Sequence, residues 1–264
     1  MTKKRAMLPE QRRQRILDLV KEAGGANLAV LAKELGISEA TARRDLAALE
    51  DLRGAWKGQE DPWGAVLPGL SQREDSFQHR LGEAVAAKKR LARAALDLVG
   101  EGEAVFVDSS TTAYYAAQRM VGTLWRGTFL TNLVPVMDLF GSAESPDLSL
   151  IGMGGAFSPL SLSFVGPCAI RTIQAYLADR AFLSVWGISP KGYLTDANPL
   201  EAEVKRAMIQ QAAEPVLLVD GRKFERRGLS VIAHVSEVSL VLTAEASLSH
   251  VKVVEDMGVS VQRI

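Results

Sequence analysis

Apolar residues in the first 53 positions recur every three or four residues, which is typical of short amphipathic helices. Three runs share this spacing: Ile16, Leu17 and Val20; Leu28, Leu31 and Leu35; and Ala42, Leu46 and Leu49. A tight turn at 35–38 separates the second run from the third, and Ser38 is placed to cap the third helix. Three short helices with such a turn predict a helix-turn-helix unit.

From residue 103 onward, short apolar runs alternate with stretches of helical spacing. The strand-like runs are Ala104–Val107, Thr128–Leu130, Leu148–Ile151, Ala181–Trp186, Val216–Val219, Leu240–Leu242 and Val259–Val261. The helical stretches are Thr112–Met120, Glu201–Ala213 and Glu245–Met257. Such alternation predicts an α/β domain with a mostly parallel sheet and helices on both faces.

The segment between these two patterns has a third character. Six glycines and prolines between residues 54 and 69 exclude a helix there and predict a small β-wing followed by a linker. One long helix is then predicted from about Arg73 to Val99. We therefore expect a winged helix-turn-helix domain at 1–65, a linker and long helix at 66–99, and an α/β effector domain at 100–264.

Composition narrows the classes of protein that fit. The chain has 264 residues, of which 47% are hydrophobic, so wholesale disorder is excluded. Its 31 basic and 31 acidic residues balance, which argues against binding of polyanions through bulk charge. The charge is uneven, however: residues 1–60 carry twelve basic and nine acidic residues. The basic excess thus lies where a DNA backbone would need it.

The cysteine and histidine residues give no indication of a catalytic thiol or a metal site. The single cysteine, Cys168, lies in an apolar stretch and is expected to be a buried structural thiol. The three histidines are scattered without metal-binding spacing, so no metal site is expected. Neither a secretory signal nor a membrane-spanning run stands out, since the longest uncharged stretch, 148–170, is broken by glycine and proline. We expect a cytoplasmic protein with no membrane partner.

The third helix is a candidate recognition helix. Arg44 lies about 200° around the helix from Ala42 and Leu46 and so faces outward. Such helices commonly contact bases through their first turn. The expected DNA-binding residues are Ser38, Glu39, Thr41, Arg43 and Arg44, together with Arg12 and Arg13 before the helix and Lys57 in the predicted wing. By spacing alone, a solvated charged face fits equally well.

Polar turns follow three strands of the predicted sheet and are typical of an anion site. Residues 108–112 join a strand to a helix start, where free amides and hydroxyls suit a phosphate. Thr131 and Asn132 follow the next strand, and Gly154 and Gly155 follow a third. Lys205 and Lys223 are candidate cations for the ligand. The plain alternatives are a Ser/Thr helix cap and solvated surface lysines.

The segment 36–50 contains Thr41-Ala42-Arg43-Arg44-Asp45-Leu46 and closely resembles the recognition segment of DeoR-family bacterial transcriptional regulators. Further motifs resemble the effector domain of that family, in the same order: 108–112, 131–132, 154–155, 163–167, 203–208 and 220–224. The resemblance implies a domain similar in fold to ribose 5-phosphate isomerase that senses a phosphorylated sugar. It implies a ligand site lined by Asp108, Ser109, Ser110, Thr111, Thr112, Asn132, Gly154, Gly155, Lys205 and Lys223.

Three departures accompany the resemblance. Ala42 replaces a larger residue that is common at that core position, which is expected to loosen the packing of the third helix. Ser110 stands where many members have glycine, which alters the expected phosphate loop. The usual Arg-x-His-Gly-Gly-Ala motif of the wing is poorly kept at 56–65, which puts the DNA contacts of the wing in doubt.

The resemblance and the patterns together predict a sequence-specific DNA-binding regulator, expected to repress a carbohydrate-metabolism operon. A phosphorylated sugar is expected to be the effector, acting through residues 54–99 or a subunit interface. A homo-oligomer, dimer or tetramer, is expected on operator DNA. No catalytic residue and no cofactor are predicted, because Asp108 and Glu203 have equally good structural roles. The alternatives are a sugar-phosphate isomerase or deaminase with an accessory helical domain, and a helical protein-interaction module.

Overall fold

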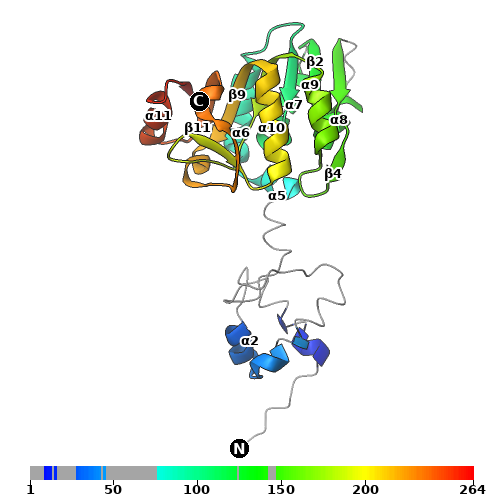
Figure 1. Ribbon diagram of the computed structural model, residues 1–264, viewed down its shortest axis with the longest axis vertical. Coiled ribbons are helices and arrows are strands. Elements are labelled where there is room, and N and C mark those ends of the chain that lie inside the picture. Colours follow the sequence, from blue (N-terminus) through cyan, green and yellow to red (C-terminus); the bar gives the residue numbers. More distant parts are fainter. Residues whose placement is uncertain are drawn as a thin grey trace, which may run out of the picture. The chain divides into compact units, whose positions relative to one another are not determined.

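The computed structural model describes residues 9–13, 15–16, 28–42, 44–45, 76–123, 125–141 and 147–264. The chain forms two compact units, Met1–Ser76 and Phe77–Ile264 (Figure 1). The predicted wing at 54–65, with Lys57, lies outside the described residues, as does Arg43. No helix among the described residues is long and apolar enough to cross a membrane.

The N-terminal unit contains helical residues at 9–13 and 15–16, helix α2 (Leu28–Leu35), and helical residues at 39–42 and 44–45. Gly36 has a φ of +63°, and the amides of Gly36 and Ile37 donate to the carbonyls of Lys33 and Ala32. This pairing is the Schellman arrangement, which ends α2 at a left-handed glycine. Ser38 Oγ then accepts from the Thr41 amide at 3.3 Å and caps the next helix, as predicted.

The C-terminal unit is built on a seven-stranded sheet whose pairings are all parallel. Its strands are β1 (Ala104–Val107), β2 (Gly127–Thr131), β3 (Leu148–Gly152), β6 (Ala178–Leu183), β9 (Ala212–Asp220), β11 (Leu240–Ala244) and β12 (Ser260–Arg263). The order across the sheet is β12-β11-β9-β6-β1-β2-β3. The predicted fold class, a helix-turn-helix unit followed by a mostly parallel α/β domain, is confirmed.

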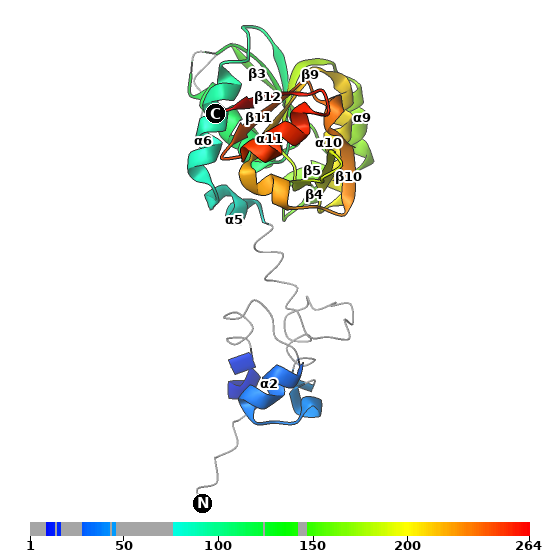
Figure 2. The ribbon, with the colours of Figure 1, turned by 90° about the vertical axis from the view of Figure 1, so that its left-hand side faces the viewer.

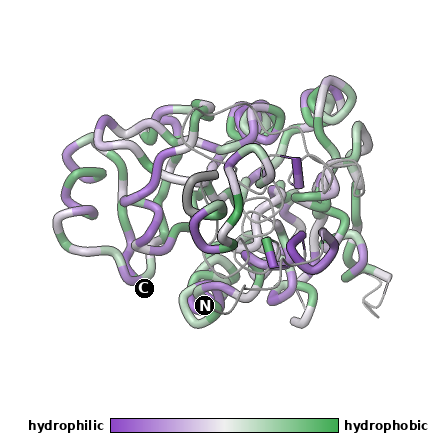
Figure 3. The backbone as a smooth tube through the Cα atoms, turned by 90° about the horizontal axis from the view of Figure 1, so that it is seen from below, coloured by the Kyte–Doolittle hydropathy of each residue, from purple (hydrophilic) through white to green (hydrophobic). Residues whose placement is uncertain are grey.

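Helices cover both faces of this sheet. They are α6 (Val85–Leu96), α7 (Thr111–Val121) and α8 (Val134–Gly141), and α9 (Pro167–Gln174), α10 (Pro199–Gln211) and α11 (Leu248–Glu255). Side chains of a strand alternate between the faces: Val105 and Val107 pack in the core under α6 and α7, whereas Phe106 packs in the core under α9 and α10. Figure 2 shows α6 on one side of the strands and α9 and α10 on the other. Hydrophobic and hydrophilic stretches accordingly alternate along the backbone (Figure 3).

Smaller elements lie between the main strands and helices. Strands β4 (Ala156–Ser158) and β5 (Ser163–Val165) form an antiparallel pair. A second antiparallel sheet contains β7 (Gly187–Ile188), β8 (Tyr193–Asp196) and β10 (Ser230–His234). Two 3-10 turns, η1 (Gly221–Glu225) and η2 (Val235–Glu237), complete the unit.

Two local predictions are wrong. The expected long helix is divided into α5 (Phe77–Gly82) and α6, because Ala84 between them has a φ of +46°, which a continuous right-handed helix does not allow. Cys168 is exposed rather than buried. The residues next to Cys168 in the sequence are apolar, but Cys168 lies on the outer side of the first turn of α9. The next residue, Ala169, is fully buried.

Candidate functional site

The candidate effector site lies where the strand order of the large sheet changes direction. From β1 the chain adds β2 and β3 on one side, and then β6, β9, β11 and β12 on the other. Asp108 follows β1, Ser184 follows β6, and Asp220 ends β9. Open α/β sheets bind ligands outside the carboxyl ends of their strands at such a switch point.

The turn from β1 into α7 is held in shape by Asp108. This carboxylate is fully buried and accepts hydrogen bonds from the amides of Ser110 (2.9 Å) and Ser184 (3.0 Å). Ser110 caps α7, with its Oγ accepting from the Ala113 amide at 3.1 Å. Burial raises the pKa of the Asp108 carboxyl above its usual value, although the Lys205 ammonium opposes this shift.

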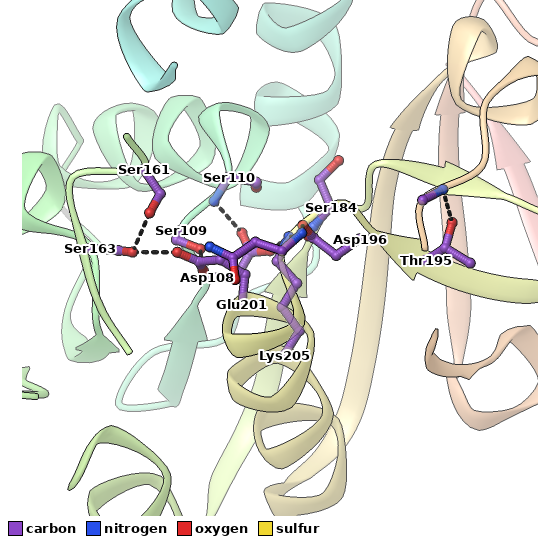
Figure 4. A network of polar contacts seen from close by, with 12 residues as sticks. Asp108, Ser109, Ser110, Ser161, Ser163, Ser184, Thr195, Asp196, Glu201 and Lys205 are labelled. Carbon is purple, nitrogen blue, oxygen red and sulfur yellow. Dashed lines mark hydrogen bonds and ion pairs between the residues drawn. The ribbon is translucent and has the colours of Figure 1, made fainter. Parts of the chain in front are cut away.

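Lys205 is the cation at the centre of this network (Figure 4). Its side chain is only 5% exposed, its Nζ donates to Asp196 at 2.6 Å and it lies 3.6 Å from Asp108. Burial alone would lower the pKa of Lys205, but the two carboxylates outweigh burial and raise it. Burial likewise acts to raise the pKa of Asp196, and Lys205 reverses the shift. The three groups therefore form a buried triad that bridges α10, β8 and the β1–α7 turn.

A second polar chain joins α10 to the β4–β5 hairpin (Figure 4). Glu201, 4% exposed, accepts from Ser109 Oγ and from Ser163 Oγ, the latter at 2.6 Å. Ser163 in turn hydrogen-bonds Ser161 at 2.9 Å. Sequence reasoning considered Glu203, which is exposed, and missed Glu201. The available signals were the position of Glu201 in the first turn of a helix and its spacing of three and seven residues from the buried Val204 and Met208.

Above the triad lies a cavity whose walls are predominantly basic. Its charged lining comprises Arg80, Lys88, Lys205, Arg222, Lys223 and Arg226 against Glu83, Asp196 and Asp220. Arg222 is paired with Asp220 at 3.0 Å and with Glu83 at 3.5 Å. Lys223 and Arg226 lie over the ring of Trp186, at 5.9 and 5.6 Å from its centroid. Six cations against three carboxylates leave a positive excess that suits an anion.

Two lysines of this wall are perturbed by their surroundings. Burial, together with the nearby Lys223 and Arg222, lowers the pKa of Lys88 to about 8. Burial also lowers the pKa of Lys223 to about 8; Asp220 opposes this shift, while Arg80 and other cations add to it. Crowded cations without full compensation are the arrangement that an anionic ligand relieves.

The structure brings together only part of the predicted effector set. Ser110, Thr111, Thr112, Lys205 and Lys223 line the cavity. Asp108 and Ser109 lie directly beside them through the contacts given above. The lining residues outside every site motif of the sequence analysis are Arg80, Glu83, Lys88, Ser184, Val185, Trp186, Asp196 and Arg226, whereas Asp220 and Arg222 belong to the 220–224 motif.

Four predicted effector residues have other surroundings. Thr131 Oγ1 donates to the Val107 carbonyl at 2.7 Å, and Asn132 Nδ2 donates to the Phe164 carbonyl at 2.9 Å. Gly154 is exposed, and a Cβ on Gly155 would come within 2.6 Å of the Val165 carbonyl. These contacts hold β2 and the segment after β3 against the β4–β5 hairpin. A role for the four residues in ligand binding stays a prediction.

The third helix of the N-terminal unit presents the expected outward face. Glu39 and Arg44 are exposed, Thr41 is half-buried, and Ala42 is fully buried. Arg44 Nε donates to the Ala40 carbonyl of its own helix at 3.3 Å. The guanidinium is therefore positioned along the helix surface, where a duplex could be contacted.

Arg12 and Arg13 have an internal partner. Both bind the Asp45 carboxylate: Arg12 through two nitrogens, one at 3.0 Å, and Arg13 through Nε at 3.5 Å. Asp45 is 3% exposed, and the Arg12 hydrogen bond holds the pKa of its carboxyl below the usual value. These ion pairs tie the first helix to the third. Contact of Arg12 and Arg13 with DNA stays a prediction.

No group of three or more His, Cys, Asp or Glu side chains within the described ranges could hold a metal ion. The site is thus a cation-rich cavity next to the buried triad of Asp108, Asp196 and Lys205, and its wall offers hydroxyls, a helix N-terminus and guanidinium groups. Such a donor set recognises phosphate or carboxylate groups.

Known proteins match this chain over nearly its whole length. A family model described as a DeoR-like helix-turn-helix domain matches residues 12–55, and the DeoR C terminal sensor domain matches residues 83–245. The HTH-type transcriptional repressor GlcR of Bacillus subtilis is 30% identical over 90% of this chain and 89% of its own length. The HTH-type transcriptional regulator GlpR of Haloferax volcanii is 32% identical over 90% of each chain.

Among solved structures, ribose 5-phosphate isomerase A of Methanocaldococcus jannaschii matches with a TM-score of 0.39 and 16% identity. The match covers 53% of this chain and 54% of the isomerase, and likeness at this level carries no argument about activity. By contrast, the two family models together match parts of both units of the chain, and GlcR and GlpR each align with 90% of it. The protein is therefore a DNA-binding transcriptional regulator of the DeoR family.

Proposed function

We propose that this regulator represses a carbohydrate-metabolism operon and that a phosphorylated sugar, bound in the basic cavity, lowers its affinity for operator DNA. The observation that carries the proposal is the cation excess at the carboxyl ends of β1, β6 and β9. Repression, as opposed to activation, is part of the proposal, because the relatives differ in this respect. GlcR is named a repressor, whereas a 29% identical Escherichia coli relative is named the L-fucose operon activator.

A phosphate group suits the wall of the cavity. Thr111 and Thr112 begin an 11-residue helix, α7, and its first amides have no partner within the helix. Helix N-termini with hydroxyls bind phosphates readily. Lys88 and Lys223 add positive charge, while the hydroxyl and carboxylate groups around Glu201 offer partners for the sugar. A phosphate dianion offsets the positive excess of the wall.

The proposed activity is binding without turnover. General acid–base catalysis needs a carboxylate that is free to exchange a proton with the substrate. Asp108 is held by two amides and Lys205, and Glu201 by two serine hydroxyls. These partners give both carboxylates structural roles. Turnover of ribose 5-phosphate or glucosamine 6-phosphate by the purified protein would instead favour the isomerase or deaminase alternative.

A thermal-shift panel of phosphorylated sugars tests the ligand class. A true effector at about 100 times its dissociation constant should stabilise the protein by about 2.7 kcal/mol. Lys223→Gln should weaken that ligand about tenfold, because it removes a charge-assisted hydrogen bond. The matched control is Lys191→Gln, an exposed lysine that does not line the cavity. Equal affinities of the two variants, or no shift with any phosphorylated sugar, would contradict the proposal.

Effector affinity should also depend on pH. The ammonium groups of Lys88 and Lys223, whose pKa values are about 8, are the forms that attract a phosphate. The phosphate dianion is already formed above about pH 6. As pH rises through 8, the free protein loses these protons, so the dissociation constant should increase by up to about tenfold for each of the two lysines from about pH 7 to about pH 9. Calorimetry in two buffers should show proton uptake on binding at about pH 8.5. A flat profile would contradict the role of the lysines.

A further inference from the structure

Helix α5 (Phe77–Gly82) is the first element of the C-terminal unit, directly after the last residue of the N-terminal unit, Ser76. Phe77 anchors it: the side chain is 1% exposed and packs edge-on against Tyr114 of α7, with ring centroids 5.7 Å apart. The Phe77 amide donates to the Leu160 carbonyl in the β4–β5 hairpin at 2.8 Å. Any movement of α5 therefore moves the point where the chain enters this unit.

The other end of α5 is held by groups that line the effector cavity. The Arg80 carbonyl accepts from Lys88 Nζ and from Thr111 Oγ1, the latter at 3.5 Å. In the turn after α5, Glu83 accepts from Arg222 Nη1 at 3.5 Å. Buried Arg80 Nε has no hydrogen-bond partner within the described part of the chain. Two cavity cations, Lys88 and Arg222, thus hold α5 in its present position.

We propose that α5 couples the effector cavity to the DNA-binding unit: an anion in the cavity takes Lys88 and Arg222 from Arg80 and Glu83 and so releases α5. This inference rests on the proposed function, since it assumes that the cavity binds the anionic effector. Within residues 54–99, the segment that transmits the effect of the anion is then α5 and the turn that follows it.

The incoming anion and the groups of α5 and its following turn compete for the same cations, Lys88 and Arg222. Glu83 is the carboxylate that an incoming anion must replace at Arg222 Nη1, because Asp220 holds the opposite side of the guanidinium through Nε and Nη2. The same anion would draw Lys88 Nζ away from the Arg80 carbonyl and would offer Arg80 Nε an acceptor. Because coupling is reciprocal, a change that favours the released α5 must strengthen anion binding and weaken operator binding together.

Glu83→Gln tests this coupling, because it weakens the α5 contact of Arg222 without removing a group that would bind the anion. The matched control is Glu203→Gln, an exposed position on α10 that does not line the cavity. The full chain is used, with inorganic phosphate as the anion probe in calorimetry and a duplex from its own promoter region in fluorescence anisotropy. We expect Glu83→Gln to bind phosphate about three- to fivefold more tightly and the duplex about three- to fivefold more weakly than Glu203→Gln.

The outcomes separate this inference from the function on which it rests. If Glu83→Gln binds phosphate more tightly but binds the duplex like Glu203→Gln, the cavity binds anions and α5 does not transmit their effect. Unchanged phosphate affinity would overturn the competition at Arg222. If the unsubstituted protein binds neither phosphate nor its promoter duplex, the proposed function fails first, and the coupling fails with it.

Discussion

Replacing Lys205 by methionine should lower the free energy of unfolding of the C-terminal unit by about 3–5 kcal/mol, because it leaves two buried carboxylates without their cation. Asp108 is fully buried and Asp196 is 8% exposed, so neither can recover hydration by a small movement. Methionine keeps most of the volume of the lysine, which limits any contribution from a cavity. Chemical denaturation of the full chain, followed through the transition of this unit, measures the loss.

The control for this substitution is Lys191→Met, which makes the same chemical change at an exposed turn and should alter stability by less than about 0.5 kcal/mol. Adding Asp196→Asn to Lys205→Met should recover part of the loss, since one of the two uncompensated charges disappears. A Lys205→Met protein as stable as the control would show that the triad does not contribute to folding in the way its burial indicates.

Replacing Arg44 by alanine should weaken operator binding by about 1–3 kcal/mol, or roughly ten- to a hundredfold, and should relax sequence preference at one base position. Arg44 is exposed on the helix surface opposite the fully buried Ala42, so the substitution should leave the fold unchanged. Fluorescence anisotropy with a promoter duplex and a random duplex, at moderate salt, measures both affinity and preference.

The control is Arg93→Ala, which removes an exposed arginine from α6 in the other unit. An equal loss on both duplexes would identify Arg44 as a phosphate contact rather than a base contact. An unchanged affinity for Arg44→Ala would favour a protein-interaction module. If the unsubstituted protein showed no preference for its promoter duplex, sequence-specific recognition would be contradicted.

Elements whose cause is local could be predicted from the sequence. Ala104–Val107 is a strand with the predicted bounds, because a short apolar run between polar residues is typical of a buried strand. The turn at Gly36 and the cap at Ser38 also follow from neighbouring residues alone. The basic cavity was found in part, through the hydroxyls after β1 and through Lys205 and Lys223.

What the sequence did not reveal depends on partners that are distant along the chain. Glu201 and Glu203 lie about 200° apart around α10, but the partner that draws Glu201 into the polar network, Ser163, lies 38 residues away in the sequence. No glycine or asparagine at position 84 predicts its left-handed conformation, so the break between α5 and α6 was not predicted. Arg80 and Lys88, which lie on either side of that break, both line the cavity.

The pairing of β1 with both β2 and β6 has a consequence for how the chain folds. Val105 lies beside Phe129 on one side and beside Arg180 on the other. During synthesis the first pairing can form early, but the second must wait until the chain has passed residue 180. Sheets that join such distant segments fold slowly, and a strand with one bare edge can pair with another molecule. A nascent or truncated chain that ends before β6 therefore exposes one edge of β1 to aggregation, whereas synthesis of the N-terminal unit ends long before.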